Sequence, residues 1–271
     1  MHVGLDLIIQ YYSDPRPDRR AELEYCVRRN LANRHVDSVH NLGAHDTPLP
    51  DDIRGHSKFT TVGIDHRMTF RDAFDHANRH LVGRMVGICN LDIFLDDDSD
   101  WHSAERLVRS SSLVLCQSRT EFSPVGGMHL DPTFARLAFA NAQDAWFFVA
   151  PLQLPAIDFE LGTLGCDNAL AERIKRAGAI PVNMASRYRI LHYDVCRGKQ
   201  GGNTNEMHRC EAASRGTTYS QYPEQDGCYL TPDIDMIPSI DDLLRTLAVD
   251  EIRRYQIISD IVSERIQIRN T

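Results

Sequence analysis

One stretch, Met85–Asp98, limits the possible folds of this chain more than any other. It begins with five apolar or small residues, Met85–Cys89, which are typical of a buried strand in a parallel sheet. Asn90 and Asp92 follow, and a carboxylate at the end of a buried strand is costly unless a positive group meets it. Because ligands of open α/β sheets bind outside the carboxyl ends of the strands, Asp92 is predicted to hold a hard divalent cation such as Mg²⁺ or Mn²⁺. The alternative is that Asn90 and Asp92 only cap a turn.

Strand and helix patterns alternate along the first part of the chain. Apolar runs predict strands at Leu5–Tyr12, Val36–Leu42 and Thr60–Ile64. Helical spacing predicts one helix that begins near Pro17 and a second at Thr69–Leu81. This order of elements implies a parallel α/β sheet.

The predicted helix at Thr69–Leu81 has the clearest local signals. Thr69 and Asp72 have the spacing of a capping box, and Gly83 follows the last turn. Arginines crowd the outer face of the helix after Pro17, and we interpret them as a solvated surface.

The rest of the chain continues the alternation and then changes in composition. Loops are expected at Thr47–Gly55 and Glu121–Asp131. Further helices are predicted at Trp101–Arg109 and Ala169–Ala177, and further strands at Leu113–Cys116, Ala145–Val149, Ile180–Val182 and Tyr188–Tyr193. Residues 1–195 therefore form the expected core, and residues 196–271 an extension of the same domain. In that extension, Cys196–Asp226 is polar and is predicted to be a lid, and helical spacing follows it.

Composition excludes several classes of protein. The net charge of −8 argues against nonspecific nucleic-acid binding, which requires a cationic surface. No apolar run approaches the roughly 20 residues of a membrane helix, and no signal peptide is visible. The seven cysteines are scattered without a Cys-x-x-Cys pair, which argues against a disulfide framework or a zinc site. A cytoplasmic location is the simplest expectation, and peripheral attachment to a membrane stays open.

Several short motifs, in order, resemble those of a known superfamily. They are Gln10-Tyr11-Tyr12, Arg67-x-Thr69-Phe70-x-Asp72, Asn90-Leu91-Asp92-Ile93, Asp144-Ala145-Trp146-Phe147-Phe148, Gly165-Cys166-Asp167-Asn168 and His192. Together they resemble glycosyltransferases of the GT-A fold, and most closely a loosely characterised set of bacterial, viral and plant sequences. The resemblance covers roughly residues 7–194. It implies a Rossmann-type, mostly parallel sheet flanked by helices, with a C-terminal loop and helical extension.

The resemblance also implies a metal site. The acidic metal motif of such enzymes is usually two aspartates around one residue, and here Asn90 replaces the first. Asp92 would then be the main ligand of Mn²⁺ or Mg²⁺, and His192 matches the late histidine that completes the site. The cluster Asp96-Asp97-Asp98 is the rival site, although a following helix N-terminus would favour these carboxylates in any case. The alternative for His192 is a hydrogen-bonded core histidine.

Roles for the remaining residues follow from the same resemblance. Asp167 matches the general base of inverting members, and its alternative is a helix cap. Asp144 would bind donor-sugar hydroxyls or hold its loop, whereas Trp146 is interpreted as core. The residues expected to contact the donor are Gln10, Tyr11, Tyr12, Arg67, Asp72, Asn90 and Gly165.

The expected function is therefore metal-dependent transfer of a sugar from a nucleotide diphosphate sugar, UDP- or GDP-linked, to an acceptor hydroxyl. The acceptor would be a glycan or another small molecule, with no nucleic acid and no integral membrane segment involved. Two alternatives stay open: a nucleotidyltransferase, and a non-catalytic carbohydrate-binding or interaction protein on the same fold. A nucleotidyltransferase would need a Gly-rich phosphate loop after the first strand, and Ser13-Asp14-Pro15-Arg16 lacks glycine.

Overall fold

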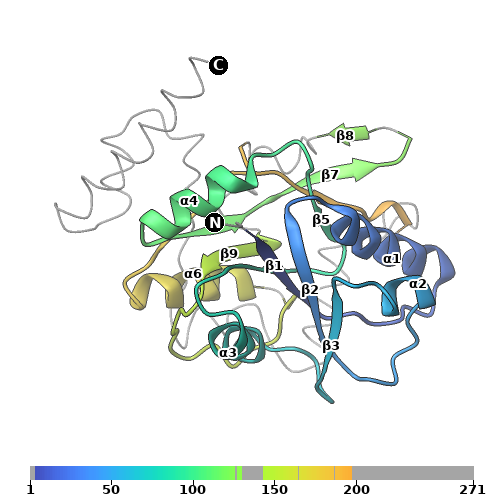
Figure 1. Ribbon diagram of the computed structural model, residues 1–271, viewed down its shortest axis with the longest axis horizontal. Coiled ribbons are helices and arrows are strands. Elements are labelled where there is room, and N and C mark those ends of the chain that lie inside the picture. Colours follow the sequence, from blue (N-terminus) through green and yellow to red (C-terminus); the bar gives the residue numbers. More distant parts are fainter. Residues whose placement is uncertain (1–3, 126, 130–142, 164, 186, 197–271) are drawn as a thin grey trace.

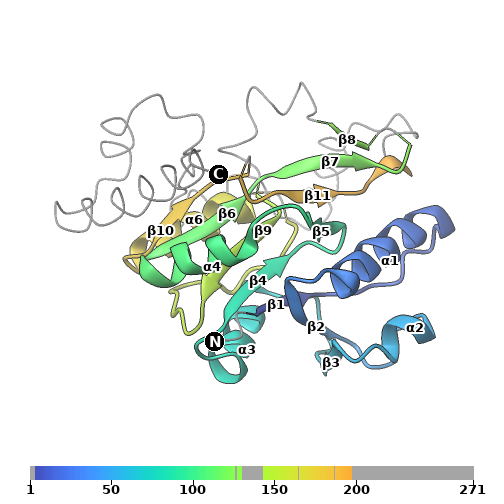
Figure 2. The same ribbon diagram turned by 45° about the horizontal axis from the view of Figure 1, so that its top comes forward.

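A central sheet of seven strands organises the protein. The computed structural model describes residues 4–125, 127–129, 143–163, 165–185 and 187–196. The strands lie in the order β10-β6-β9-β4-β1-β2-β3. Figure 1 labels β9, β1, β2 and β3 of this sheet, and Figure 2 also labels β10, β6 and β4. Their bounds are β1 (Leu5–Ile9), β2 (Val36–Gly43), β3 (Phe59–Gly63), β4 (Met85–Cys89), β6 (Leu113–Gln117), β9 (Ala145–Val149) and β10 (Ile180–Val182).

The sheet is parallel except at β9, which runs antiparallel to both of its neighbours, β4 and β6. The start of β9 therefore lies at the same edge as the carboxyl ends of the other strands. A glycine in β4 allows the close packing here, because a Cβ on Gly87 would lie 2.5 Å from the ring of Phe147. The prediction of a mostly parallel Rossmann-type sheet is confirmed.

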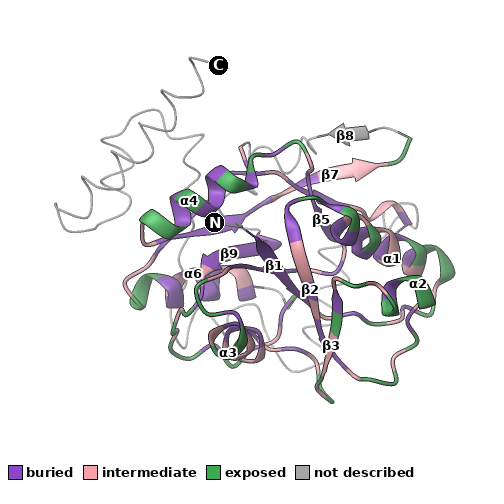
Figure 3. Ribbon diagram, viewed as in Figure 1, coloured by how far each residue is buried: buried purple, intermediate pink, exposed green. Residues whose placement is uncertain are grey.

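Four of the helices cover the two faces of this sheet. Buried residues of α1 (Pro17–Ala32) and α4 (Trp101–Ser110) belong to one apolar cluster. Those of α3 (Phe70–His80) and α6 (Cys166–Arg176) belong to a second cluster on the other face. Figure 3 shows the resulting pattern, with buried strands and with exposed positions on the outer sides of the helices.

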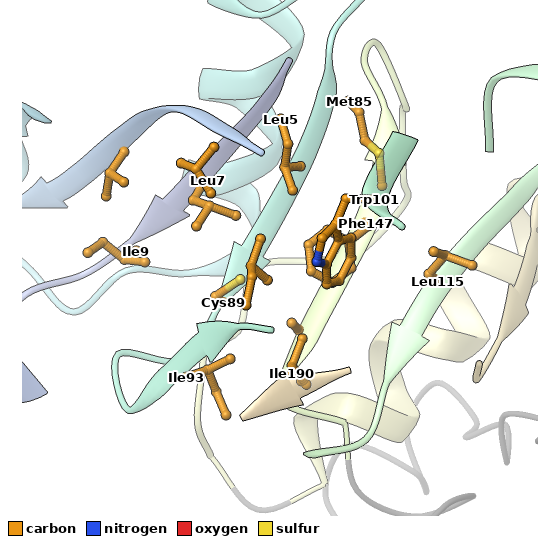
Figure 4. Packing of buried hydrophobic residues seen from close by; sticks show 14 of the residues in the cluster. Leu5, Leu7, Ile9, Met85, Cys89, Ile93, Trp101, Leu115, Phe147 and Ile190 are labelled. Carbon is orange, nitrogen blue, oxygen red and sulfur yellow. The ribbon is translucent and has the colours of Figure 1, made fainter. Parts of the chain in front are cut away.

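Aromatic side chains fill both clusters. On the first face, Trp101 lies against Phe147 with ring centroids 4.8 Å apart (Figure 4). On the second, Trp146 meets Phe70 edge to face at 5.0 Å and is fully buried. The interpretation of Trp146 as a core residue is therefore confirmed.

The helix boundaries follow the local signals. Pro17 occupies the first position of α1, where its missing N–H costs nothing. Thr69 and Asp72 form the predicted capping box at the start of α3. The interpretation of the arginines of α1 as a solvated face holds for Arg28 and Arg29, whose side chains are 42% and 38% exposed. It is wrong for Arg19, which is buried among carboxylates at the first turn.

A second, smaller sheet lies beside the first and has the order β5-β11-β7-β8. Its strands are β5 (Ile93–Leu95), β11 (Ile190–His192), β7 (Arg119–Ser123) and β8 (Gly127–His129). Figure 2 shows β7 and β11 running side by side, and they pair in parallel. The prediction of a loop at Glu121–Asp131 is thus wrong over the described residues. One of the two partners of β7, the strand β11, comes from about 70 residues later along the chain, and local sequence patterns do not reveal such a pairing.

Three smaller findings complete the fold. The predicted loop at Thr47–Gly55 contains a short helix, α2 (Asp51–Arg54). The five cysteines among the described residues are all unpaired. No helix in the described part of the chain has the length and apolar character needed to cross a bilayer. The predicted lid beyond Cys196 and the C-terminal helices lie outside the described residues.

Candidate functional site

Polar side chains gather where the strands of the main sheet end. Asn90 and Asp92 follow β4, and Asp144 immediately precedes β9. The Asn90 backbone N–H donates to the carbonyl of Asp144 at 3.0 Å, which holds the two segments together. The antiparallel direction of β9 therefore brings a second acidic position to the edge where β4 ends.

The small sheet places His192 next to Asp92. In the β5–β11 pair, His192 lies opposite Ile93, one residue after Asp92, and the Tyr193 N–H donates to the carbonyl of Asp92 at 3.0 Å. The His192 Nε2 atom is consequently 3.3 Å from Asp92 Oδ2. The structure thus brings together the two residues proposed as metal ligands.

A second carboxylate belongs to the same cluster. Asp194 Oδ2 lies 4.0 Å from His192 Nε2, and one ligand atom each from Asp92, His192 and Asp194 lies within 4.8 Å of the others. Two carboxylates and one imidazole form a donor set that suits Mn²⁺ or Mg²⁺. The residues present therefore fit a divalent cation.

Arg19 lies inside this acidic cluster. Its guanidinium is 1% exposed and donates to Asp92, to Glu22 at 3.1 Å and to the carbonyl of Tyr193 at 3.0 Å. It also lies 3.2 Å from Asp194 Oδ1. A fixed positive charge thus already balances part of the buried negative charge.

A chain of ion pairs connects His192 to the start of β9. His192 Nδ1 lies 2.8 Å from Glu121 Oε2, because His192 is in register with Glu121 in the β7–β11 pair. Arg119 then bridges Glu121, at 2.8 Å, and Asp144, at 3.2 Å. Asn90 Nδ2 donates to Asp144 Oδ1 at 2.8 Å, so the network returns to the loop that carries Asp92.

These contacts set the charges in the network. Burial would raise the pKa of Glu121, but His192 and Arg119 outweigh it and lower this pKa to about 2. Burial and Arg119 would both lower the pKa of His192, but Asp92 and Glu121 outweigh them and raise it to about 9. Both shifts favour the charged forms of these two side chains, which attract each other across the β7–β11 pair.

Asp167 stands at the first turn of α6, on the other side of Asp144. The N-cap of α6 is Gly165, with φ of 85°, so the alternative that Asp167 is the N-cap residue is wrong. Asp167 instead accepts from the backbone N–H groups of Gln143, at 3.2 Å, and Asn168, at 3.1 Å. Burial, assisted by the nearby charge of Asp144, outweighs these donors and raises the pKa of Asp167 to about 7. A carboxyl group with that pKa can exchange a proton near neutral pH.

The three residues after β1 are placed differently from one another. Gln10 joins two backbone groups of the segment between β3 and α3, accepting from Met68 N–H at 2.8 Å and donating to His66 O at 2.9 Å. Tyr11 is 2% exposed, whereas Tyr12 is 49% exposed. Of the two tyrosines, only Tyr12 presents a broad surface to solvent at the end of β1.

Two further residues that are expected to contact the nucleotide-sugar donor, Arg67 and Asp72, bond to other parts of the protein. Arg67 donates to the carbonyl of Leu161 at 2.8 Å, next to Gly162. Gly162 has φ of 72°, and a Cβ there would lie 3.2 Å from Arg67. Asp72 is engaged by the capping box and by His66 Nε2 at 3.0 Å.

Sequence patterns missed five charged residues of the network. They are Arg19, Glu22, Arg119, Glu121 and Asp194. The rival acidic site is not part of this network: Asp96 pairs with Arg189 at 2.6 Å, and Asp97 with Arg29 at 2.9 Å. The alternation of Arg119 and Glu121 within a strand was the one local signal that could have pointed to inward-facing charges.

Comparisons with protein-family models and with curated proteins found no match. Solved structures are similar in fold, among them a mannosyltransferase from Pyrobaculum calidifontis in complex with GDP-Man and Mn²⁺. It is 13% identical with a TM-score of 0.51, and the match covers 96% of this chain and 74% of that one.

Two weaker likenesses have TM-scores below 0.5. GalNAc-T7 with UDP, GalNAc and Mn²⁺ is 11% identical with a TM-score of 0.47, covering 95% of this chain and 58% of that one. A 4-diphosphocytidyl-2C-methyl-D-erythritol synthase is 12% identical with a TM-score of 0.42, covering 77% of this chain and 99% of that one. The strand order and the likeness to the mannosyltransferase together show a GT-A-like fold.

Proposed function

We propose that this protein transfers a sugar from a nucleotide diphosphate sugar to an acceptor hydroxyl, with a divalent metal. One observation carries the proposal. A cluster of metal-ligand type, Asp92 with His192 and Asp194, is joined through Arg119 and Asp144 to the surroundings of a carboxyl group with a pKa near 7, Asp167. Both lie at the strand ends of a GT-A-like sheet, where ligands of such sheets bind.

The donor would bind over Asp92 and His192. A divalent metal held by Asp92, His192 and Asp194 would supply Lewis-acid stabilisation of the leaving diphosphate. Asn90 Nδ2 donates to Asp144, so its amide oxygen would be the atom that contacts the donor. Tyr12, exposed at the end of β1, is the side chain best placed to meet the nucleotide base.

Asp167 would take the proton of the acceptor hydroxyl. A sugar hydroxyl is a weak nucleophile, and a positioned carboxylate that removes its proton speeds the attack. The backbone N–H groups of Gln143 and Asn168 hold the carboxylate in place. Asp144, paired with Arg119 and Asn90, would bind hydroxyls of the donor sugar or hold the loop before β9 in place.

The first test asks whether a nucleotide binds with metal. The melting temperature is measured with UDP, GDP, CDP and dTDP, each with and without Mn²⁺. We expect a stabilisation that requires Mn²⁺ and one preferred base, because a ligand that binds only the folded state raises its stability. No shift with any nucleotide would favour a non-catalytic interaction protein. Pyrophosphate release from a nucleoside triphosphate would favour a nucleotidyltransferase.

The second test addresses Asp167 as the general base. Asp167→Asn keeps the shape of the side chain but cannot take a proton, so we expect transfer to fall about 10²- to 10⁴-fold. The Mn²⁺-dependent rise in melting temperature with nucleotide should persist. Glu172→Gln, on the same helix and paired with Arg176 at 3.1 Å, is the matched control and should transfer normally. Equal loss of transfer and nucleotide binding in Asp167→Asn would assign Asp167 a structural role.

A further inference from the structure

The Arg19 guanidinium occupies the position that a cation would take between Asp92 and Asp194. Three carboxylates surround it, those of Glu22, Asp92 and Asp194. It is 1% exposed, so bulk solvent screens these contacts little. The positive charge of Arg19 therefore stabilises a group of carboxylates that would otherwise repel one another in a buried site.

Arg19 contacts the Asp92 oxygen that faces His192 and one of the two oxygens of Asp194. Asp92 Oδ2 accepts from Arg19 and is also the atom that faces His192 Nε2 at 3.3 Å. Asp194 places Oδ1 3.2 Å from Arg19 and Oδ2 4.0 Å from His192. A metal ligated by both aspartates would lie against the guanidinium, and two cations at such short range repel strongly in a poorly solvated site.

Arg19 also has a partner that it can keep without Asp92 and Asp194. Glu22 lies one turn further along α1 and contacts Arg19 at 3.1 Å. The other oxygen of Glu22 accepts from the backbone N–H groups of Val195, at 2.9 Å, and Cys196, at 2.8 Å. Glu22 is thus fixed in place, and Arg19 can remain charge-balanced when it leaves the aspartates.

We propose that Arg19 is an internal cation that competes with the divalent metal for Asp92 and Asp194. This inference rests on the proposed function and adds a control on its metal site. In the absence of a nucleotide, Arg19 balances part of the negative charge of these carboxylates and the metal binds weakly. Metal occupancy then requires Arg19 to move toward Glu22 or toward an incoming anion.

The test is direct measurement of Mn²⁺ binding without nucleotide, by titration calorimetry, on wild type and Arg19→Gln. We expect Arg19→Gln to bind Mn²⁺ at least tenfold more tightly, because the competing charge is gone. The matched control is Arg28→Gln on the same helix, which also releases two carboxylates, Asp52 and Glu24. The control should bind Mn²⁺ like wild type, which would show that freeing Glu24 of α1 and Asp52 of α2 does not produce the gain.

A second variant guards against a folding defect, since Arg19→Gln removes the positive charge from three buried or half-buried carboxylates. Arg19→Lys keeps one charge but cannot contact several carboxylates as a guanidinium does, so we expect intermediate Mn²⁺ affinity. Its melting temperature should also rise more with Mn²⁺ than that of wild type.

The inference and the proposed function fail in different ways. Mn²⁺ affinities of Arg19→Gln and Arg19→Lys that are equal to or weaker than wild type would overturn the competition, whether or not the protein transfers sugar. Absence of transfer, with the tenfold gain present, would remove the proposed reaction and leave the competition intact.

Discussion

Two clusters of arginine and carboxylates lie at opposite ends of the central sheet. At the amino end, Arg84 precedes β4 and contacts Asp6 of β1 and Asp37 of β2, the latter at 2.8 Å. At the carboxyl end, Arg19 contacts Asp92, Asp194 and Glu22. Both clusters use the same chemistry, but they are built from different parts of the fold.

The amino-end carboxylates belong to the strands themselves. Asp6 and Asp37 are fixed by the backbone of β1 and β2, and Asp6 also accepts from the Ser38 hydroxyl at 2.5 Å. At the carboxyl end, Asp92 and Asp194 lie just outside strands, and a third carboxylate and an imidazolium join them. An ion cluster whose carboxylates lie within strands ties neighbouring strands together. A cluster whose carboxylates lie on the segments after the strands can exchange an arginine for another cation.

The largest expected effect separates the two clusters. Asp92→Asn should lower transfer on the order of 10³-fold, because metal stabilisation of the leaving group amounts to several kcal/mol and about 1.4 kcal/mol corresponds to tenfold. It should also abolish the Mn²⁺-dependent nucleotide shift. Asp37→Asn, at the amino end, should lower the melting temperature and leave transfer unchanged. Similar losses of transfer in both variants would remove the functional distinction between the two ends.

The second prediction sharpens the role of the carboxyl end through pH. Because Asp167 must be ionised to act as a base and its pKa is raised to about 7, kcat/KM should fall about tenfold per pH unit below 7. Above pH 7 the profile should level off. Steady-state assays between pH 5 and 8 check this, and a flat profile over that range would exclude Asp167 as the base.

The contribution of Asp167 to the free energy of unfolding supplies an independent control. A carboxyl whose pKa is raised on folding binds more protons in the folded state between its unfolded and folded pKa values. The free energy of unfolding of wild type, relative to Asp167→Asn, should therefore decrease as pH rises from about 4 to about 7. Chemical denaturation of both variants at pH 5 and 8 measures this difference, and the opposite sign would contradict the raised pKa.

The smallest effect is expected at Asp72. Asp72→Ala removes the capping box of α3, which should cost about 1 kcal/mol and lower the melting temperature by a few degrees. Because Asp72 is already bonded to Thr69 and His66, the nucleotide shift should persist. Loss of that shift without a change in stability would instead assign Asp72 to the donor, as the resemblance implies.

Local patterns were sufficient for most of the main sheet and its helices. The apolar run Met85–Cys89 predicted β4, and the capping box of Thr69 and Asp72 predicted the start of α3. These features depend on neighbouring residues along the chain, so the sequence contains them directly. The same patterns failed at β7, whose partner β11 is distant along the chain.

The amino-acid sequence by itself determined that Asp92 follows a buried strand and that His192 lies in a late, apolar stretch. Only the tertiary structure decided that they meet, because β5 pairs with β11 in the register that places His192 opposite Ile93. Tertiary structure also decided that Arg19, one of several arginines in the predicted helix after Pro17, is enclosed by three carboxylates. Burial and long-range pairing set the charge of a site, and neither property belongs to a residue's local sequence.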